Sequence, residues 1–362
     1  MPARRDDDKK TVVHVVSYDV ARGAERYAQA LTGALNKRGS YKHVLLTMFR
    51  AEDDDLDPDI SLEVPRGLMR RIGLDPRAVW RLRGALGRLQ PAALVAHGGE
   101  PAKYAALADG GTPFAYLVIG SNHPRLASPI RRALRSFYMG KAAALVTVSD
   151  RLARDVRAEI GDDDRLRVIP NGRDPQIYRP AERGALERSR VIFIGHLEDQ
   201  KRPFLFIDLI DEIAARGVAV SAAMVGGGPL LAEVRERAEG VGVEVLGPRD
   251  DVAALLAESD LLVLTSRPPE GMPGVLIEAG LCGLPAVTTD VPGAREVVED
   301  GVTGLVVGID DLGGLSDAVE SLLRDEGLRA SMGAAARKRC AAAFSLDASA
   351  DRWDTLLQEI AK

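Results

Sequence analysis

The chain has 362 residues, enough for two domains of ordinary size, and its 46% hydrophobic and 28% charged residues are typical of a globular protein. No apolar run approaches the ~18 residues of a membrane-spanning helix, and no apolar signal region opens the chain, so we expect a cytoplasmic protein. Only Cys282 and Cys340 are present, which excludes a disulfide framework and a cysteine-rich metal site.

The net charge of −5 conceals an asymmetry between the two halves. Residues 1–170 contain 28 basic and 21 acidic residues, and residues 171–362 contain 20 basic and 32 acidic residues. Aromatic residues make up only 4% of the chain and do not alternate with the basic clusters, as platforms for stacking bases would. We therefore expect no nucleic-acid partner, and an anionic membrane surface or a phosphorylated ligand fits the basic half better.

Short runs rich in Val, Ile and Leu alternate with longer helical segments, which predicts parallel sheets with crossover helices. The predicted strands of the first half are 11–18, 43–48, 92–97, 114–120 and 144–148, with helices at 23–37, 77–89, 125–141 and 151–160. Those of the second half are 191–194, 219–225, 243–246, 261–265 and 286–289, with helices at 202–216, 229–239 and 251–258. The pattern predicts an α/β chain with two doubly wound, Rossmann-like domains.

A segment with Pro, Gly and charged residues but no periodicity separates the halves, beginning at Pro170-Asn171-Gly172-Arg173. It predicts an N-terminal domain at 1–170, a hinge at 171–188 and a C-terminal domain at 189–345. Residues 346–362 form a predicted helix with one apolar stripe, for which the N-terminal domain is one possible platform.

The loop after the predicted strand 261–265 carries the most informative motif, because ligands of open parallel sheets bind beyond the carboxyl ends of strands. Pro273 begins a helix near Gly274, whose amide groups predict a phosphate site. Glu270 precedes this helix and Glu278 lies just inside it. Carboxylates suit hydroxyl groups, so the pair favours a sugar on one side of a diphosphate and a ribose on the other. The alternative is two solvated carboxylates beside an ordinary turn.

This segment resembles the signature of the retaining GT-B glycosyltransferases of the family 4 type, in which two glutamates separated by seven residues bracket a Gly-Phe-Pro-like turn. Met272 replaces the usual aromatic residue. The segments 23–26, 168–172, 191–195, 225–229, 246–248 and 292–298 are similar to other markers of the family in order and spacing. The resemblance implies two Rossmann-like domains facing across a cleft. It also implies retaining transfer of a sugar from a nucleotide-diphosphate donor to the hydroxyl of a lipid-linked, glycan or small-molecule acceptor.

The resemblance further implies roles for single residues. Lys201 would neutralise the donor diphosphate, Glu270 would bind the donor sugar, and Glu278 would bind the ribose. The remaining residues expected at the donor site are Gly23, Gly195, His196, Pro248, Arg249, Met272, Pro273, Gly274 and Val275. Neither a metal ion nor a cofactor is expected, because a lysine, backbone amides and a helix N-terminus can stabilise the departing diphosphate.

The chain departs from the family pattern at two positions. His196 stands where the family usually has an arginine, and a neutral imidazole neutralises phosphate less well. Gly120 stands where the family commonly has a histidine at the end of a strand. His123, three residues on, and His97, which ends another strand, are the candidates for that catalytic position, and a capping role for His123 is the alternative.

Two other functions stay open: a nucleotide-sugar epimerase on the same scaffold, and a catalytically silent subunit that binds the donor. A dinucleotide fingerprint needs a further glycine at a fixed spacing after its first two. No such glycine follows the run Gly226-Gly227-Gly228, which argues against a dehydrogenase.

A basic amphipathic stretch extends from Arg66 to Arg88 in the first half. It predicts peripheral contact with an anionic membrane or a phosphorylated acceptor, and a solvated helix face is the alternative.

Overall fold

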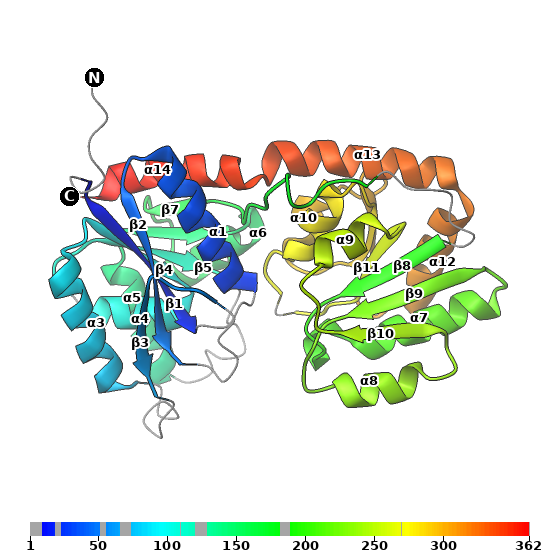
Figure 1. The fold of residues 1–362 in the computed structure, drawn as a ribbon, viewed down its shortest axis with the longest axis horizontal. Helices are drawn as coiled ribbons and strands as arrows, with labels where there is room; N and C mark the ends of the chain where they lie inside the picture. The colour runs from blue at the N-terminus through cyan, green and yellow to red at the C-terminus, as the bar shows by residue number, and fades with distance from the viewer. Residues whose placement is uncertain are drawn as a thin grey trace. The chain divides into compact units, whose positions relative to one another are not determined.

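The structure is a computed structural model that describes residues 9–18, 23–50, 56–65, 74–108, 110–119, 129–181, 189–268 and 270–361. The chain divides into two compact units (Figure 1). The first unit comprises Met1–Gly172 and Leu346–Lys362, and the second comprises Arg173–Ser345. Each unit is built on one parallel sheet, which confirms the predicted α/β architecture with two doubly wound sheets.

The first unit contains a seven-stranded sheet. Its strands are β1 (Thr11–Tyr18), β2 (Lys42–Phe49), β3 (Ile60–Val64), β4 (Ala93–His97), β5 (Phe114–Val118), β6 (Ala144–Thr147) and β7 (Leu166–Val168). Its helices are α1 (Gly23–Arg38), α3 (Pro76–Leu89), α4 (Gly99–Leu107), α5 (Pro129–Lys141), α6 (Asp150–Ile160) and α14 (Leu346–Ile360). The strands pair in the order β3-β2-β1-β4-β5-β6-β7, all parallel. Because helices cover both faces, the central strands β4, β5 and β6 are buried throughout.

The second unit contains a six-stranded sheet. Its strands are β8 (Ser189–Ile194), β9 (Val220–Val225), β10 (Val243–Gly247), β11 (Leu261–Leu264), β12 (Ala286–Thr289) and β13 (Gly304–Val307). Its helices are the 3₁₀ turn η3 (Asp199–Lys201), α7 (Pro203–Ala215), α8 (Leu231–Ala238), α9 (Val252–Ala257), α10 (Gly274–Leu281), α11 (Ala294–Val297), α12 (Leu312–Arg324) and α13 (Glu326–Ala343). The strands pair in the order β10-β9-β8-β11-β12-β13, all parallel.

The strand order in both sheets reverses direction beside the first strand of each unit. In the first unit the reversal lies between β1 and β4, and in the second between β8 and β11. Loops that leave the carboxyl ends of strands at such a reversal diverge, and the space between them is where open α/β sheets bind ligands. The segments after β8 and β11 are therefore the places to search for a site in the second unit.

The last helix, α14, belongs to the first unit and packs on α1 (Figure 1). The fully buried indole of Trp353 donates a hydrogen bond to the Tyr27 hydroxyl (3.0 Å), which also lies 2.7 Å from Ser349 Oγ. Ser349 in turn donates to the backbone oxygen of Pro170 (2.9 Å). This satisfied polar cluster fixes the helix on the unit that residues 1–172 build. The segment 171–188 is grouped with the first unit up to Gly172, and its described residues from Arg173 onward with the second.

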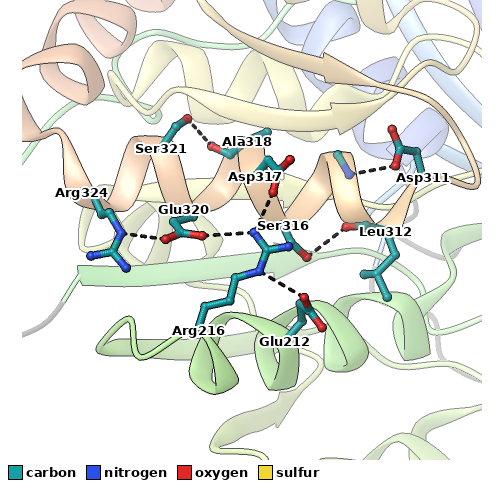
Figure 2. A network of polar contacts seen from close by, with 11 residues as sticks. Glu212, Arg216, Asp311, Leu312, Ser316, Asp317, Ala318, Glu320, Ser321 and Arg324 are labelled. Atoms are coloured by element: carbon teal, nitrogen blue, oxygen red, sulfur yellow. Dashed lines mark hydrogen bonds and ion pairs between the residues drawn. The ribbon is translucent and has the colours of Figure 1, made fainter.

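A network of ion pairs joins α7 to α12 on the surface of the second unit (Figure 2). Arg216, which caps the end of α7, lies 3.1 Å from Glu212, 2.7 Å from Asp317 and 3.1 Å from Glu320. Glu320 also pairs with Arg324 at 2.7 Å. Beneath the network, α7 and α12 contribute buried residues to one apolar core, so the network supports packing.

Among the described residues, no helix combines the length and the apolar character needed to cross a bilayer.

Candidate functional site

The loops after β8 and β9 approach each other closely at the carboxyl end of the second sheet. Gly195 donates its amide hydrogen to the Val225 oxygen at 3.0 Å. A Cβ atom on Gly226 (φ +145°) would lie only 1.9 Å from the Gly195 oxygen, so only glycine fits there. The glycine run 226–228 therefore has a packing reason of its own, which agrees with the sequence argument against a dinucleotide fingerprint.

Lys201 and Glu270, both predicted at the site, form a short ion pair. Lys201 Nζ lies 2.6 and 2.7 Å from the two carboxylate oxygens of Glu270, and the side chains are only 16% and 11% exposed. The Thr265 hydroxyl, just beyond β11, donates to the Lys201 backbone oxygen at 2.8 Å and fixes the turn that presents the lysine. The structure thus brings together a cation from the loop after β8 and a carboxylate from the loop after β11.

The loop that carries Glu270 leads into the helix α10. Pro273 is its N-cap residue and no side chain caps the first turn, so the amide groups of Gly274 and Val275 belong to an uncapped helix N-terminus. Gly293 (φ +79°) lets the loop after β12 approach the backbone of Met272, since a Cβ atom there would lie 2.9 Å from Met272 Cα. The predicted residues 272–275 therefore lie at a helix N-terminus, which carries a partial positive charge.

Glu278, one turn into α10, is held by a residue that the sequence interpretation placed only in the hinge. Arg173 Nε donates to Glu278 Oε1 at 2.6 Å, and both side chains are 14% exposed. A Cβ atom on Gly274 would lie 2.2 Å from a terminal nitrogen of Arg173. The guanidinium group therefore lies over the first turn of α10.

The loop after β10 carries the residues predicted for the nucleobase slot. The ring of Pro248 packs near Gly227, whose added Cβ atom would lie 3.7 Å from it. Arg249 Nε donates to Asp251 Oδ1 at 2.8 Å, and both side chains are exposed. His196 is also exposed, and its backbone oxygen accepts a hydrogen bond from Glu198 at 2.8 Å. The roles of Pro248, Arg249 and His196 toward a nucleotide stay predictions.

In the first unit, His97 belongs to a chain of three buried histidines. His14 Nδ1 lies 3.1 Å from His97 Nε2, and His14 Nε2 lies 3.0 Å from His43 Nδ1. Burial disfavours the charged imidazolium, which lowers the pKa of His43 to about 4 and that of His97 to about 3. The pKa of His14 also falls well below its usual value, because of burial and its two histidine neighbours. At neutral pH His97 is therefore an uncharged imidazole bound to His14, and its catalytic role stays a prediction.

The structure gives less information on the other candidates of the first unit, Gly23, Gly120 and His123. Gly23 opens α1, and a Cβ atom added to it meets no heavy atom within 4 Å, so packing does not require glycine there. Its predicted approach to a diphosphate stays a prediction. Gly120 and His123 lie outside the described residues.

Within the described part of the chain, no group of three or more His, Cys, Asp or Glu side chains is arranged to hold a metal ion.

Comparison with known proteins places these observations in a family. A family described as "Glycosyltransferase Family 4" matches residues 21–177, and one described as "Glycosyl transferases group 1" matches residues 188–325. Among solved structures, Anabaena Alr3699/HepE in complex with UDP and glucose superposes with a TM-score of 0.81 at 18% identity, over 97% of this chain and 100% of that chain. The fold is therefore that of the GT-B glycosyltransferases. The chain belongs to the family 4 type of these proteins.

Two curated relatives show how far the similarity extends. The N-acetyl-alpha-D-glucosaminyl L-malate synthase of Bacillus anthracis is 27% identical over 67% of this chain and 65% of that protein. The D-inositol 3-phosphate glycosyltransferase of Mycobacterium bovis is 30% identical over 72% of this chain and 55% of that protein. The matched part of this chain thus spans less than two thirds of each relative's length.

Proposed function

We propose that this chain transfers a sugar, with retention of anomeric configuration, from a nucleotide-diphosphate donor to an acceptor hydroxyl. The observation that carries the proposal is the short Lys201–Glu270 pair, whose glutamate lies in the loop that leads into the uncapped N-terminus of α10. It gathers a cation, helix amides and a carboxylate at the carboxyl end of β11, as binding of a diphosphate attached to a polyol requires. Family membership and the UDP and glucose bound by Anabaena Alr3699/HepE support the choice of donor class.

The chemistry follows from where charge develops. As the bond between sugar and phosphate breaks, negative charge grows on the departing diphosphate. The amides of Gly274 and Val275 already lie at a helix N-terminus, and Lys201 joins them in stabilising that charge once its ammonium group turns from Glu270 to phosphate. Glu270, released from Lys201 when the ammonium turns to phosphate, then accepts hydrogen bonds from sugar hydroxyls. In the donor complex Lys201 thus pairs with phosphate and Glu270 with sugar hydroxyls, in place of their ion pair.

Retention follows if the leaving phosphate itself takes the proton of the acceptor hydroxyl on the same face of the sugar. In this proposal no metal ion is required, because fixed protein dipoles and Lys201 do the electrostatic work. The measurement that tests this part is turnover in excess EDTA together with NMR of the anomeric proton of the product. Inhibition by EDTA that added Mg²⁺ reverses, or an inverted product, would contradict it.

A thermal-shift panel tests donor binding. The ligands are UDP, ADP and GDP and their glucose conjugates, and a ligand at about 100 times its dissociation constant stabilises the folded state by roughly 2.7 kcal/mol. We expect one nucleotide series to stabilise the protein, and the Anabaena Alr3699/HepE structure makes UDP the first choice. Sugar release without any acceptor would indicate the epimerase alternative, and binding without turnover would indicate a silent subunit. The proposal fails if no series binds.

We predict that Glu278→Ala weakens binding of the nucleoside diphosphate and of its sugar conjugate equally. The variant removes a charged acceptor of ribose hydroxyls, worth about 1.5–3 kcal/mol for a hydrogen bond to a charged group. Calorimetric titration measures the loss, with Glu258→Ala, an exposed carboxylate of the same unit, as the control. Unchanged affinity for both ligands would remove Glu278 from the site.

We also propose peripheral contact of the basic stretch with an anionic membrane, the setting of a lipid-linked acceptor. Of this stretch the structure describes α3, on which Trp80 is 76% exposed and Arg83 and Arg88 are exposed. An exposed tryptophan next to arginines is typical of a helix that lies at a membrane surface. Arg81, in contrast, donates to the backbone oxygens of Leu62 and Glu63 at 2.6 and 2.9 Å, so it supports the fold.

Vesicle sedimentation checks this contact. Binding to vesicles with phosphatidylglycerol should weaken steeply with salt and should fall in Trp80→Ala and in Arg83→Ser/Arg88→Ser. Each basic residue near such a surface is worth about 1 kcal/mol, so the double variant should lose roughly 30-fold. Arg216→Ser, in the second unit, is the control. Equal binding to neutral and anionic vesicles would refute the membrane contact.

A further inference from the structure

We infer that Arg173 is a positioning residue of the donor site, which holds Glu278 in the orientation that binds the ribose hydroxyls. The inference rests on the proposed function. Its basis is the charged hydrogen bond of 2.6 Å between Arg173 Nε and Glu278 Oε1, made by two side chains that are each 14% exposed. A charge-assisted bond of this kind, largely removed from water, fixes one carboxylate oxygen in place.

The backbone of Arg173 is itself held firmly where the second unit begins. Its amide donates to the Phe344 oxygen at 3.0 Å, and the residue forms a parallel bridge with Ser345, the last residue of the unit. The guanidinium group thus projects from a point that two segments of chain fix. A glutamate without such a partner must give up freedom of its side-chain rotamers on binding. Arg173 removes that freedom in advance.

Gly274 is independent evidence that the local structure accommodates the Arg173–Glu278 contact. A Cβ atom at this first position of α10 would lie 2.2 Å from a terminal nitrogen of Arg173, so a side chain here would displace the guanidinium group from its contact with Glu278. Glycine at this position leaves the space that the contact needs. Electrostatics alone does not explain the placement, since a cation is disfavoured at a helix N-terminus. The Glu278 carboxylate compensates for it.

Comparison of a nucleotide with its analogue that lacks ribose hydroxyls separates a role through Glu278 from other roles. The probes are UDP and 2′,3′-dideoxy-UDP, or the ADP or GDP pair if the panel above selects that base. Calorimetry on the full chain measures both affinities for wild type, Arg173→Met and Arg173→Lys. We expect Arg173→Met to weaken UDP about 10-fold, which is about 1.4 kcal/mol, and the dideoxy analogue less than about 2-fold. Arg173→Lys should restore part of the loss, because it keeps a charge but not the fixed geometry of the guanidinium group.

A double-mutant cycle provides the second readout. If Arg173 acts through Glu278, the variant Arg173→Met/Glu278→Gln should bind UDP no more weakly than Glu278→Gln alone. Arg216→Met, which removes an arginine from an ion-pair network on the surface of the same unit, is the matched control and should change neither affinity.

Equal loss of both probes in Arg173→Met, or additive losses in the cycle, would overturn the inference, since Arg173 would then act on the phosphates or on folding. Unchanged affinities would overturn it as well. If the wild-type protein binds no nucleotide at all, the proposed function fails and this inference fails with it, a result that wild type alone reveals.

Discussion

Lys201→Ala should lower the rate constant at saturating donor by about 100-fold or more, the scale seen when one preorganised electrostatic partner is removed from a reaction site. The ammonium group lies 2.6 Å from Glu270 and only 16% of the side chain is exposed, so when it turns to phosphate it meets the growing charge of the diphosphate in a site with little water. Because that charge is larger in the transition state than in the bound donor, turnover should suffer more than binding.

Steady-state kinetics and calorimetry together measure this effect. Lys201→Arg should recover only part of the rate, because a planar guanidinium group does not reproduce a compact ammonium. Lys338→Ala is the control, since Lys338 is an exposed lysine of the same unit. If Lys201→Ala raises only the donor Michaelis constant and leaves saturated turnover intact, Lys201 is a residue for ground-state binding and its assigned role is wrong.

The first unit should lose stability steeply as the pH falls below 6.5. The pKa of His43 is about 4 and that of His97 about 3 in the folded chain, against a usual value of 6.5. Between pH 6.5 and the pKa values of the folded chain, the unfolded chain binds protons that the folded chain does not. The free energy of unfolding is therefore highest above pH 6.5 and decreases as the pH falls. Each such histidine contributes about 1.4 kcal/mol per pH unit, or roughly 3 kcal/mol between pH 6.5 and 4.

The neighbours of the histidine chain modify this response but do not reverse it. Asp354 of α14 favours the charged form of His43, and burial outweighs it. The ring of Tyr27 from α1 lies edge-on to His97, with 6.4 Å between the ring centroids. His14 contributes in the same direction, because burial and, less strongly, its two histidine neighbours lower its pKa. A loss of several kcal/mol is comparable with the whole stability of a typical domain, about 5–15 kcal/mol.

Tryptophan fluorescence is a suitable probe, because both tryptophans of the chain lie in the first unit. Trp353 is fully buried, and Trp80→Phe would leave it as the single reporter. Urea unfolding between pH 7 and pH 4.5 gives the free energy, and His43→Asn should make its pH dependence shallower. His196→Gln, in the second unit, should leave it unchanged. A free energy that stays constant over this range would contradict the account of the buried histidines.

Much of the fold is predictable because buried parallel strands are nearly continuous apolar runs. Strands such as Thr11–Tyr18 and Leu261–Leu264 stand out for that reason. A criterion of continuous apolar runs does not select Ile60–Val64, because this edge strand alternates apolar and polar residues, and Glu63 has φ +47°. The three-residue strand Leu166–Val168 is too short for a pattern. The helix Gly99–Leu107 is not predicted, because Gly99 and Pro101 in its first turn are residues with a low helix propensity.

The candidate site was predictable only in part. The spacing of Glu270 and Glu278 around a Pro-Gly turn is local, so the sequence reveals it. The partners of these glutamates are not local: Lys201 lies 69 positions before Glu270, and Arg173 lies 105 positions before Glu278. The resemblance to a family identifies Lys201 as a site residue. Nothing in the local sequence distinguishes Arg173 from the other charged residues of its loop. The one indication in the sequence is that Arg173 is a positive charge at the start of the acidic half of the chain, where it would find a carboxylate partner.

The most direct test of the central claim is release of nucleoside diphosphate from the donor that the binding panel selects. The assay compares wild type with Lys201→Ala, with and without a mixture of hydroxyl acceptors. We expect that wild type releases the diphosphate, that acceptors accelerate the release, and that Lys201→Ala is slower by about 100-fold at saturating donor. Binding of every donor without release by the wild-type protein, or equal release by both proteins, would contradict it.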